Sequence, residues 1–160
     1  MVRTEISLFL KNVPGELGKL TNMLAGAGIN IDALSIQDAS KYVQELFRAR
    51  GKTIKRVASA ASYGSMKKDS ADYALIRLLV ENTDKAVDLL SKDGYIFDII
   101  PVIGLEIDNK PGTLAEMTKK FGEKNININY VYGSALPNGK KSLFVFCPEN
   151  IELAAQIFKD

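Results

Sequence analysis

Alternating apolar and polar positions open the chain and then give way to a helical pattern. Residues 6–10 alternate, as in a strand with one buried face, and the turn formers at 12–15 interrupt them. Leucines then recur at helical spacing through residues 17–24. We expect Pro14 at the first helical position, where its missing N–H would be unpaired anyway. The glycines at 26 and 28 should end this helix before the next strand begins.

The same pattern returns later in the chain. Residues 6–36 align without a gap with residues 103–133, which lie 97 positions further on, and ten of the 31 aligned residues are identical. Self-similarity at a fixed offset is the signature of a repeated structural unit. We therefore interpret the chain as two copies of one module.

Each copy continues with a strand and a capped helix. Residues 73–81 are rich in strand formers and precede Asn82, a favourable N-cap for a helix that ends near Lys92. In the second copy, residues 142–147 lead to Asn150 and to a helix whose apolar residues recur at positions i, i+3, i+4 and i+7. Each repeated unit therefore contains two helices.

The order of the elements predicts the fold class. Copy one has the order βαββαβ, so we expect an α+β protein with two ferredoxin-like modules in tandem and antiparallel sheets paired side by side. Module 1 covers residues 1–100 and module 2 covers residues 101–160. Residues 97–107 form one extended stretch that closes the first module and opens the second, with Pro101 as the bend. Module 2 lacks a C-terminal fourth strand, which leaves a sheet edge for another domain or chain to cover.

Composition narrows the possible chemistry. The 160 residues include no histidine and a single cysteine, Cys147. The chain therefore lacks the commonest general base and metal ligand, and we expect no enzyme activity, no metal site and no cofactor. Without a base to activate it, Cys147 is interpreted as a packed small hydrophobe. No apolar run approaches the roughly 18 residues of a membrane span and no secretory signal opens the chain, so we expect a cytoplasmic protein.

Positive charge is concentrated in an insertion of module 1, at about residues 40–70. Residues 41–68 hold eight lysines and arginines against one acid, Glu45, although the net charge of the whole chain is only +2. The spacing of apolar residues predicts a pair of helices hinged near Gly51. The segment could serve nucleic acid, a partner protein or solubility alone. Because it offers no aromatic stacking platform and no helix-turn-helix signature, we disfavour nucleic acid and interpret it as a solvated helical excursion that also covers an interface.

The repeated motif resembles the ACT domain, a small regulatory module of amino-acid metabolism. Asn-x-Pro-Gly-x-Leu occurs at 12–17 and again at 109–114. A helix and then Ile-Asn-Ile follow each motif, at 29–31 and at 126–128. The resemblance implies ferredoxin-like domains that pair their sheets side by side and bind amino acids at the interface between paired domains. It also implies that the two asparagines of each copy contact the ligand.

Elementary chemistry agrees with a zwitterion site at each motif. A helix tip presents unpaired N–H groups and the positive end of its dipole, which suit a carboxylate, and a glycine there leaves room for it. An asparagine amide can accept a hydrogen bond from an ammonium group. The predicted ligand-binding residues are Asn12, Pro14, Gly15, Asn30 and Ile31 in module 1, and Asn109, Pro111, Gly112, Asn127 and Ile128 in module 2. The neighbouring acids Asp32 and Asp108 either help to receive the ammonium group or remain solvated edge charges.

These features favour a non-catalytic regulatory protein. It would bind a free amino acid at the interface of paired ACT domains and signal amino-acid availability, and we expect it to be a homodimer or a higher homo-oligomer. Two alternatives stay open. One is a regulatory subunit that docks on a biosynthetic enzyme, and the other, which we favour less, is a transcriptional regulator associated with nucleic acid.

Overall fold

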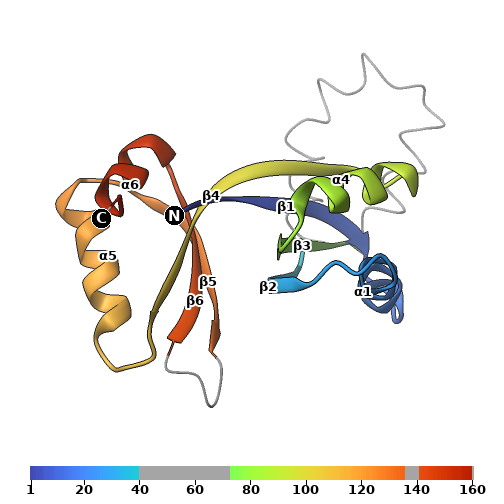
Figure 1. The fold of residues 1–160 in the computed structure, drawn as a ribbon, viewed down its shortest axis with the longest axis horizontal. Helices are drawn as coiled ribbons and strands as arrows, with labels where there is room; N and C mark the ends of the chain where they lie inside the picture. Colours follow the sequence, from blue (N-terminus) through green and yellow to red (C-terminus); the bar gives the residue numbers. More distant parts are fainter. Residues whose placement is uncertain (40–72, 136–140, 160) are drawn as a thin grey trace.

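The computed structural model describes residues 1–39, 73–135 and 141–159. Within them, one six-stranded antiparallel sheet carries four helices (Figure 1). Module 1 supplies β1 (Val2–Lys11), α1 (Glu16–Gly26), β2 (Ile31–Asp38), β3 (Tyr73–Val80) and α4 (Thr83–Lys92). The chain continues with β4 (Phe97–Asp108), α5 (Thr113–Glu123), β5 (Ile128–Ala135), β6 (Lys141–Pro148) and α6 (Ile151–Ile157). The predicted α+β class is confirmed, and the helix pair predicted in the basic insertion lies outside the described residues.

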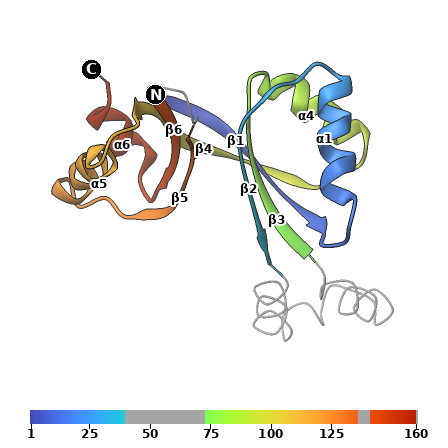
Figure 2. The ribbon, with the colours of Figure 1, turned by 90° about the horizontal axis from the view of Figure 1, so that it is seen from below.

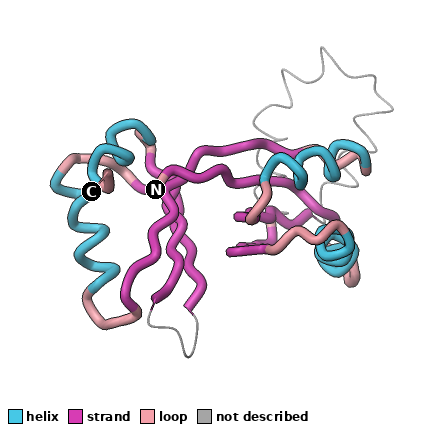
Figure 3. Tube along the Cα trace, viewed as in Figure 1, coloured by secondary structure: helices cyan, strands magenta, loops and turns pink. Residues whose placement is uncertain are grey.

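The sheet contains two ferredoxin-like halves. Its strand order is β2-β3-β1-β4-β6-β5, so β1 lies beside β3 in the first half just as β4 lies beside β6 in the second. Helices α1 and α4 cover the outer face of one half, and α5 and α6 cover the outer face of the other (Figure 2). The two half-sheets continue into one another through the long strands β1 and β4 (Figure 3). The two predicted tandem modules are therefore joined side by side in one sheet.

Strands β1 and β4 are related by an approximate two-fold axis. Thr4 pairs with Pro101, which is its own counterpart in the second copy, 97 residues on. The register is antiparallel and continuous around this point, so a pair on one side of the axis has an equivalent pair on the other. Pro101 lies inside an unbroken strand, which agrees with the extended stretch expected over residues 97–107.

Strand β1 takes the place of the fourth strand of module 2. In module 1, the first half of β4 lies beside β1 as its fourth strand. By the same symmetry, the beginning of β1 lies beside the second half of β4. The N–H of Gly104 donates to the carbonyl of Met1 over 2.9 Å, and the Met1 amino group donates to the Gly104 carbonyl over 3.1 Å. The chain thus covers from within much of the edge that the sequence leaves open.

Helices α4 and α6, the second helix of each module, start as their sequences predict. The side-chain oxygen of Asn82 accepts a hydrogen bond from the N–H of Lys85, and that of Asn150 accepts one from the N–H of Leu153, both over 3.0 Å. Each asparagine satisfies one of the N–H groups that a helix start leaves unpaired.

Helix α1 starts differently from our expectation. It begins at Glu16, with Gly15 as the N-cap, so the prediction of Pro14 at the first helical position is wrong. The backbone of Gly15 has φ 95°, a left-handed conformation that glycine adopts without steric cost. This turn separates Pro14 from the helix, and Gly112 makes the same turn before α5 with φ 94°.

Three apolar clusters hold the sheet and helices together. In module 1, Leu20 and Leu24 of α1 are fully buried against the sheet, as their spacing predicts. In module 2, the rings of Phe121 and Phe146 lie 5.2 Å apart between helix and sheet. The third cluster lies between the helix-free faces of the two half-sheets. Its buried members are Ala33, Leu79, Val102, Val145 and Cys147, so Cys147 is a packed residue as expected.

Candidate functional site

The two repeated helix tips have no side-chain cap. Helices α1 and α5 begin at Gly15 and Gly112, and no side chain caps either start, in contrast to the asparagine caps of α4 and α6. A Cβ built on either glycine would meet nothing within 4 Å. Each tip therefore presents N–H groups and a positive dipole end to open space, which is an arrangement suited to an anion.

The two tips differ in their charged neighbours. The first turn of α1 carries Glu16, whose carboxylate pairs with the ammonium group of Lys19 over 2.5 Å. The equivalent position in α5 is Thr113, whose hydroxyl donates to the carbonyl of Lys110. Lys110 in turn forms an exposed ion pair with Asp108 over 3.0 Å. A ligand carboxylate would meet Glu16 at the first position of α1 and the Thr113 hydroxyl at the first position of α5, although the first turn of α5 also carries an acid, Glu116.

The four predicted asparagines are exposed, but the two of one module do not lie together. Asn12 follows the end of β1 that pairs with Tyr73, whereas Asn30 precedes Ile31, which pairs with Val80 at the other end of β3. The eight residues of β3 separate these levels, which corresponds to roughly 25 Å along a strand. A site made by Asn12 and Asn30 of the same module is therefore excluded.

Module 2 repeats this separation. Asn109 follows the end of β4, where Asp108 pairs with Lys141, whereas Asn127 precedes Ile128, which pairs with Pro148 at the other end of β6. The helix tips, with their Pro-Gly turns, thus lie at one end of each half-sheet, and the Ile-Asn-Ile segments lie at the other end. The segments that begin β2 and β5 both lie near the axis that relates β1 to β4.

Asn30 is connected to a chain of polar contacts. Its amide nitrogen lies 3.4 Å from Oδ1 of Asp32. The other carboxylate oxygen of Asp32 accepts from the guanidinium of Arg3 over 2.5 Å, and the same guanidinium donates to the carbonyl of Val80 over 3.2 Å. Asp32 is therefore paired with Arg3. It is neither a free carboxylate that could receive an ammonium group nor a solvated charge at the sheet edge, which were the two roles considered from the sequence.

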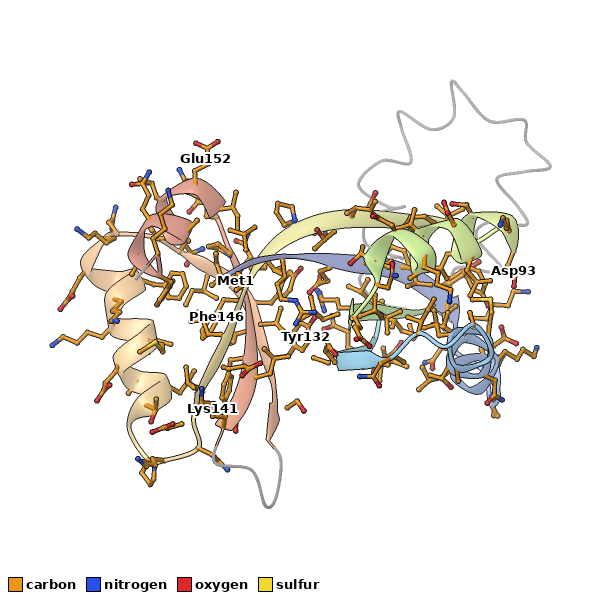
Figure 4. All side chains as sticks on the ribbon, viewed as in Figure 1. Met1, Asp93, Tyr132, Lys141, Phe146 and Glu152 are labelled. Atoms are coloured by element: carbon orange, nitrogen blue, oxygen red, sulfur yellow. The ribbon has the colours of Figure 1, made fainter. Side chains whose placement is uncertain are left out.

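A second polar cluster joins the modules and was not predicted from the sequence. Glu5 of β1 is fully buried, and its two carboxylate oxygens accept hydrogen bonds from the hydroxyls of Tyr130 and Tyr132 of β5, over 2.6 Å and 2.8 Å. The guanidinium of Arg77 lies 4.0 Å from the centre of the Tyr130 ring. Figure 4 shows Tyr132 between the two half-sheets. We refer to Glu5, Tyr130, Tyr132 and Arg77 as the inter-module cluster.

Burial shapes the protonation of the inter-module cluster. It raises the pKa of the Glu5 carboxyl above its ordinary value, against the opposing effects of the two tyrosine hydrogen bonds and the charge of Arg77. Burial, together with the neighbouring Glu5 carboxylate, also raises the pKa of both tyrosine hydroxyls far above the ordinary range, so they remain donors. The alternating positions of Tyr130 and Tyr132 place them on one face of a strand, but nothing local connects them to a residue 125 positions earlier.

The described residues offer few other chemical features. Among them, no group of three or more cysteines and acids is placed to hold a metal ion. None of the helices in the described ranges is long and apolar enough to cross a membrane. The basic stretch at 41–68 lies outside the described residues.

Comparison with known proteins places these features in a family context. The family described as an ACT domain pair matches residues 46–159. Protein BT0572 from Bacteroides thetaiotaomicron has a TM-score of 0.71 and 26% identity, covering 99% of this chain and 88% of that one. No curated protein matches the sequence.

Two regulatory subunits of aspartate kinase share the fold. The ligand-free subunit from Thermus thermophilus has a TM-score of 0.59 and 15% identity, and the match covers 99% of this chain and 91% of that one. The subunit from Thermus flavus has a TM-score of 0.52 and 16% identity, with 98% and 92% covered. At these identities the likeness concerns the fold alone.

Proposed function

The chain belongs to the ACT domain pair family, and from this membership we propose that it is a non-catalytic regulatory protein that binds a free amino acid where two ACT modules pair. The observation that carries the proposal is the pair of uncapped helix tips at Gly15 and Gly112. In the same chain, the other two described helices use asparagine caps. A ligand carboxylate would supply the hydrogen-bond acceptor that these two tips lack.

The ligand site needs residues from two modules. Asn12 and Asn30 lie at opposite ends of module 1. A ligand held by both would therefore lie between two copies of module 1 whose strands run in opposite directions. Two β2 edges placed antiparallel around Leu34 would bring Asn30 of one copy level with the Asn12 end of the other. We therefore expect the functional form to be a homodimer or a higher homo-oligomer, with the asparagines of each site contributed by different copies.

The expected affinity is that of a sensor. Charge-assisted hydrogen bonds contribute about 1.5–3 kcal/mol each and a helix end about 0.3–1 kcal/mol. Desolvation and lost ligand freedom offset much of this sum. A dissociation constant on the order of micromolar to millimolar follows, which suits the measurement of a metabolite pool. The ligand would regulate by binding one arrangement of the modules more tightly than another.

Thermal denaturation with each of the twenty amino acids tests this function. At about 100 times its dissociation constant, a ligand should stabilise the folded protein by about 2.7 kcal/mol and raise the melting temperature accordingly. Asn12→Ala, Asn30→Ala, Asn109→Ala and Asn127→Ala should identify the pair that abolishes the rise. Asn22→Ala, a change at another exposed asparagine, should leave the rise intact. The absence of a response to all twenty would refute amino-acid binding.

Mixed oligomers test whether two copies build the site. If Asn12 and Asn30 act together, Asn12→Ala and Asn30→Ala chains should each lose the response, and co-refolding them in equal amounts should restore roughly a quarter of the sites, because one site of each mixed dimer keeps both asparagines. Because Asn12 and Asn30 lie at opposite ends of one module, a mixture that stays unresponsive would end their joint role in one site.

A second candidate function is a regulatory subunit of a biosynthetic enzyme. It is favoured by the shared fold with the aspartate kinase regulatory subunits of the two Thermus species. In this case the chain would form a stable complex with a larger enzyme, and the amino acid would change the activity of that enzyme. The two candidate functions can be distinguished by purifying the endogenous protein at low salt and applying it to size-exclusion chromatography. A free oligomer supports the first function, and a stoichiometric complex with an enzyme supports the second.

A further inference from the structure

The inner faces of the two half-sheets form a distinct contact between the modules. The apolar cluster between them has five buried members, in contrast to eleven in the core of module 1. Its partly buried neighbours include Tyr130 and Tyr132, whose hydroxyls reach across to Glu5. This contact therefore combines a small apolar cluster with a buried charge, and the polar part decides how well the two faces fit.

The polar groups of this contact are divided between the modules. The second-copy counterparts of Arg3 and Glu5 are Ile100 and Val102, and the first-copy counterparts of Tyr130 and Tyr132 are Ala33 and Ser35. Module 1 thus supplies the charges and module 2 the hydroxyl donors. Neither module carries both the charges and the hydroxyl donors. The inter-module cluster is therefore specific to the pairing of module 1 with module 2, and it does not arise from residues that the two copies share.

The inter-module cluster lies next to both Ile-Asn-Ile segments. On the module 1 side, Arg3 lies two residues before Glu5 on the same face of β1, and it holds Asp32, which contacts Asn30. On the module 2 side, Tyr130 comes three residues after Asn127. The strand register shifts between Ile31 and Ala33 and, at the equivalent place, between Ile128 and Tyr130. Such bulges allow local adjustment without loss of the whole strand pairing.

We propose that the inter-module cluster couples the Asn30 end of module 1 to the β5 strand of module 2, so that a change at one segment alters the other. The inference rests on the proposed function only where it takes the segments that contain Asn30 and Asn127 to contact the ligand. The coupling itself is a property of the free protein and follows from the contacts of Glu5, Tyr130, Arg3 and Asp32.

A buried charge makes this coupling cooperative. An ionised carboxylate that loses its hydrogen-bond donors without gaining water is strongly disfavoured, so intermediate separations of Glu5 from the tyrosines are poorly populated. Either the hydroxyls bond to Glu5 and the faces fit, or the contact opens and water enters. A shift of Arg3, caused by the release of Asp32, acts on this balance because Arg3 and Glu5 belong to the same strand.

Hydrogen exchange of the ligand-free full-length chain tests the coupling. Asp32→Asn removes the charge that holds Arg3 but nearly keeps the side-chain shape. We expect it to lower the protection of backbone amides in β5 by about tenfold, a typical coupling between residues of one network. In the Tyr130→Phe/Tyr132→Phe background, which keeps both rings, Asp32→Asn should change β5 protection less than twofold. In a Tyr95→Phe background, a matched loss of a hydroxyl in the module 1 core, the full effect should remain.

The outcomes separate the coupling from the proposed function. An unchanged β5 after Asp32→Asn, or an equal effect in the wild-type and Tyr130→Phe/Tyr132→Phe backgrounds, would overturn the coupling. If the double background does not fold, Tyr132→Phe alone, which leaves one bond to Glu5, serves the same comparison. Because no amino acid is added, a failed ligand screen leaves this result untouched. When the screen does find a ligand, its effect on β5 exchange should be lost in the Tyr130→Phe/Tyr132→Phe background, which removes both hydrogen bonds to Glu5.

Discussion

A fully buried carboxylate persists in a fold only where hydrogen bonds replace the water that it loses. Glu5 meets this condition through the two tyrosine hydroxyls, which approach its two oxygens separately. Arg77 also acts on Glu5, while Arg3 lies near the Tyr132 hydroxyl and Cys147 near the Tyr130 hydroxyl. At the scale of single residues, Glu5 therefore combines a large desolvation cost with contacts that only the assembled modules provide.

Substitution of Glu5 by glutamine should change the pH dependence of stability. Burial raises the pKa of the folded carboxyl above the ordinary value of 4.5, so just above pH 4.5 the folded state holds a proton that the unfolded chain has released. The free energy of unfolding then falls as the pH rises through this window. The stability of the wild type relative to Glu5→Gln should therefore increase as the pH is lowered from 7 towards 4.5.

Urea unfolding at several pH values measures this difference. Since both proteins share every other titratable group, their difference isolates Glu5. A difference that stays constant between pH 7 and 4.5, or that changes in the opposite direction, would contradict the expected role of burial.

At the scale of elements, the described helices fall into two classes that differ in how they start. Helices α4 and α6 have asparagine caps that complete their first turn, whereas α1 and α5 start at left-handed glycines without a side-chain cap. The first class needs nothing further at its N-terminus. The second leaves N–H groups for water or a ligand, at equivalent places in the two modules.

Alanine substitutions should distinguish these two classes. Asn82→Ala and Asn150→Ala each remove a cap and should lower the free energy of unfolding by about 1 kcal/mol, within a usual range of about 0.5–2 kcal/mol. Asn12→Ala and Asn109→Ala remove exposed side chains that cap no helix and should change it by less than about 0.5 kcal/mol. Denaturant unfolding without amino acids measures all four. Equal losses in both pairs would show that Asn12 and Asn109 have a structural role.

At the scale of the whole molecule, the two modules share their central strands. β1 is the first strand of module 1 and lies in the fourth-strand position of module 2, and β4 has the reciprocal roles. Neither half can separate without breaking the β1–β4 pairing. We therefore expect the described parts of both modules to unfold together.

Core substitutions test this cooperativity. Leu20→Ala in module 1 and Phe121→Ala in module 2 both create cavities at fully buried positions and should each lower the free energy of unfolding by about 2–5 kcal/mol. In calorimetry, each should move one single transition to a lower temperature. The exposed control Asn22→Ala should leave it in place. Two separate transitions in either core variant would show that the modules are independent.

Much of this architecture could be predicted from local sequence. Alternation over residues 6–10, the leucine spacing of α1 and the caps at Asn82 and Asn150 led to the observed elements, because each pattern acts within a few residues. The ungapped repeat indicated two modules. The position of Pro14 was wrong because the left-handed turn at Gly15 intervenes, and a Pro-Gly pair permits either arrangement.

The sequence by itself determined the two α+β modules, the order of their elements and the asparagine caps of α4 and α6, since periodicity and capping depend on neighbouring residues. Only the tertiary structure decided that β1 serves both modules, that Asn12 and Asn30 lie at opposite ends of a half-sheet, and that Glu5 meets Tyr130 and Tyr132. These features depend on strand register and on the packing of two sheet faces. Both relate residues that are far apart in the sequence, such as Thr4 and Pro101 in the register and Glu5 and Tyr130 in the packing, and no local pattern records such a relation.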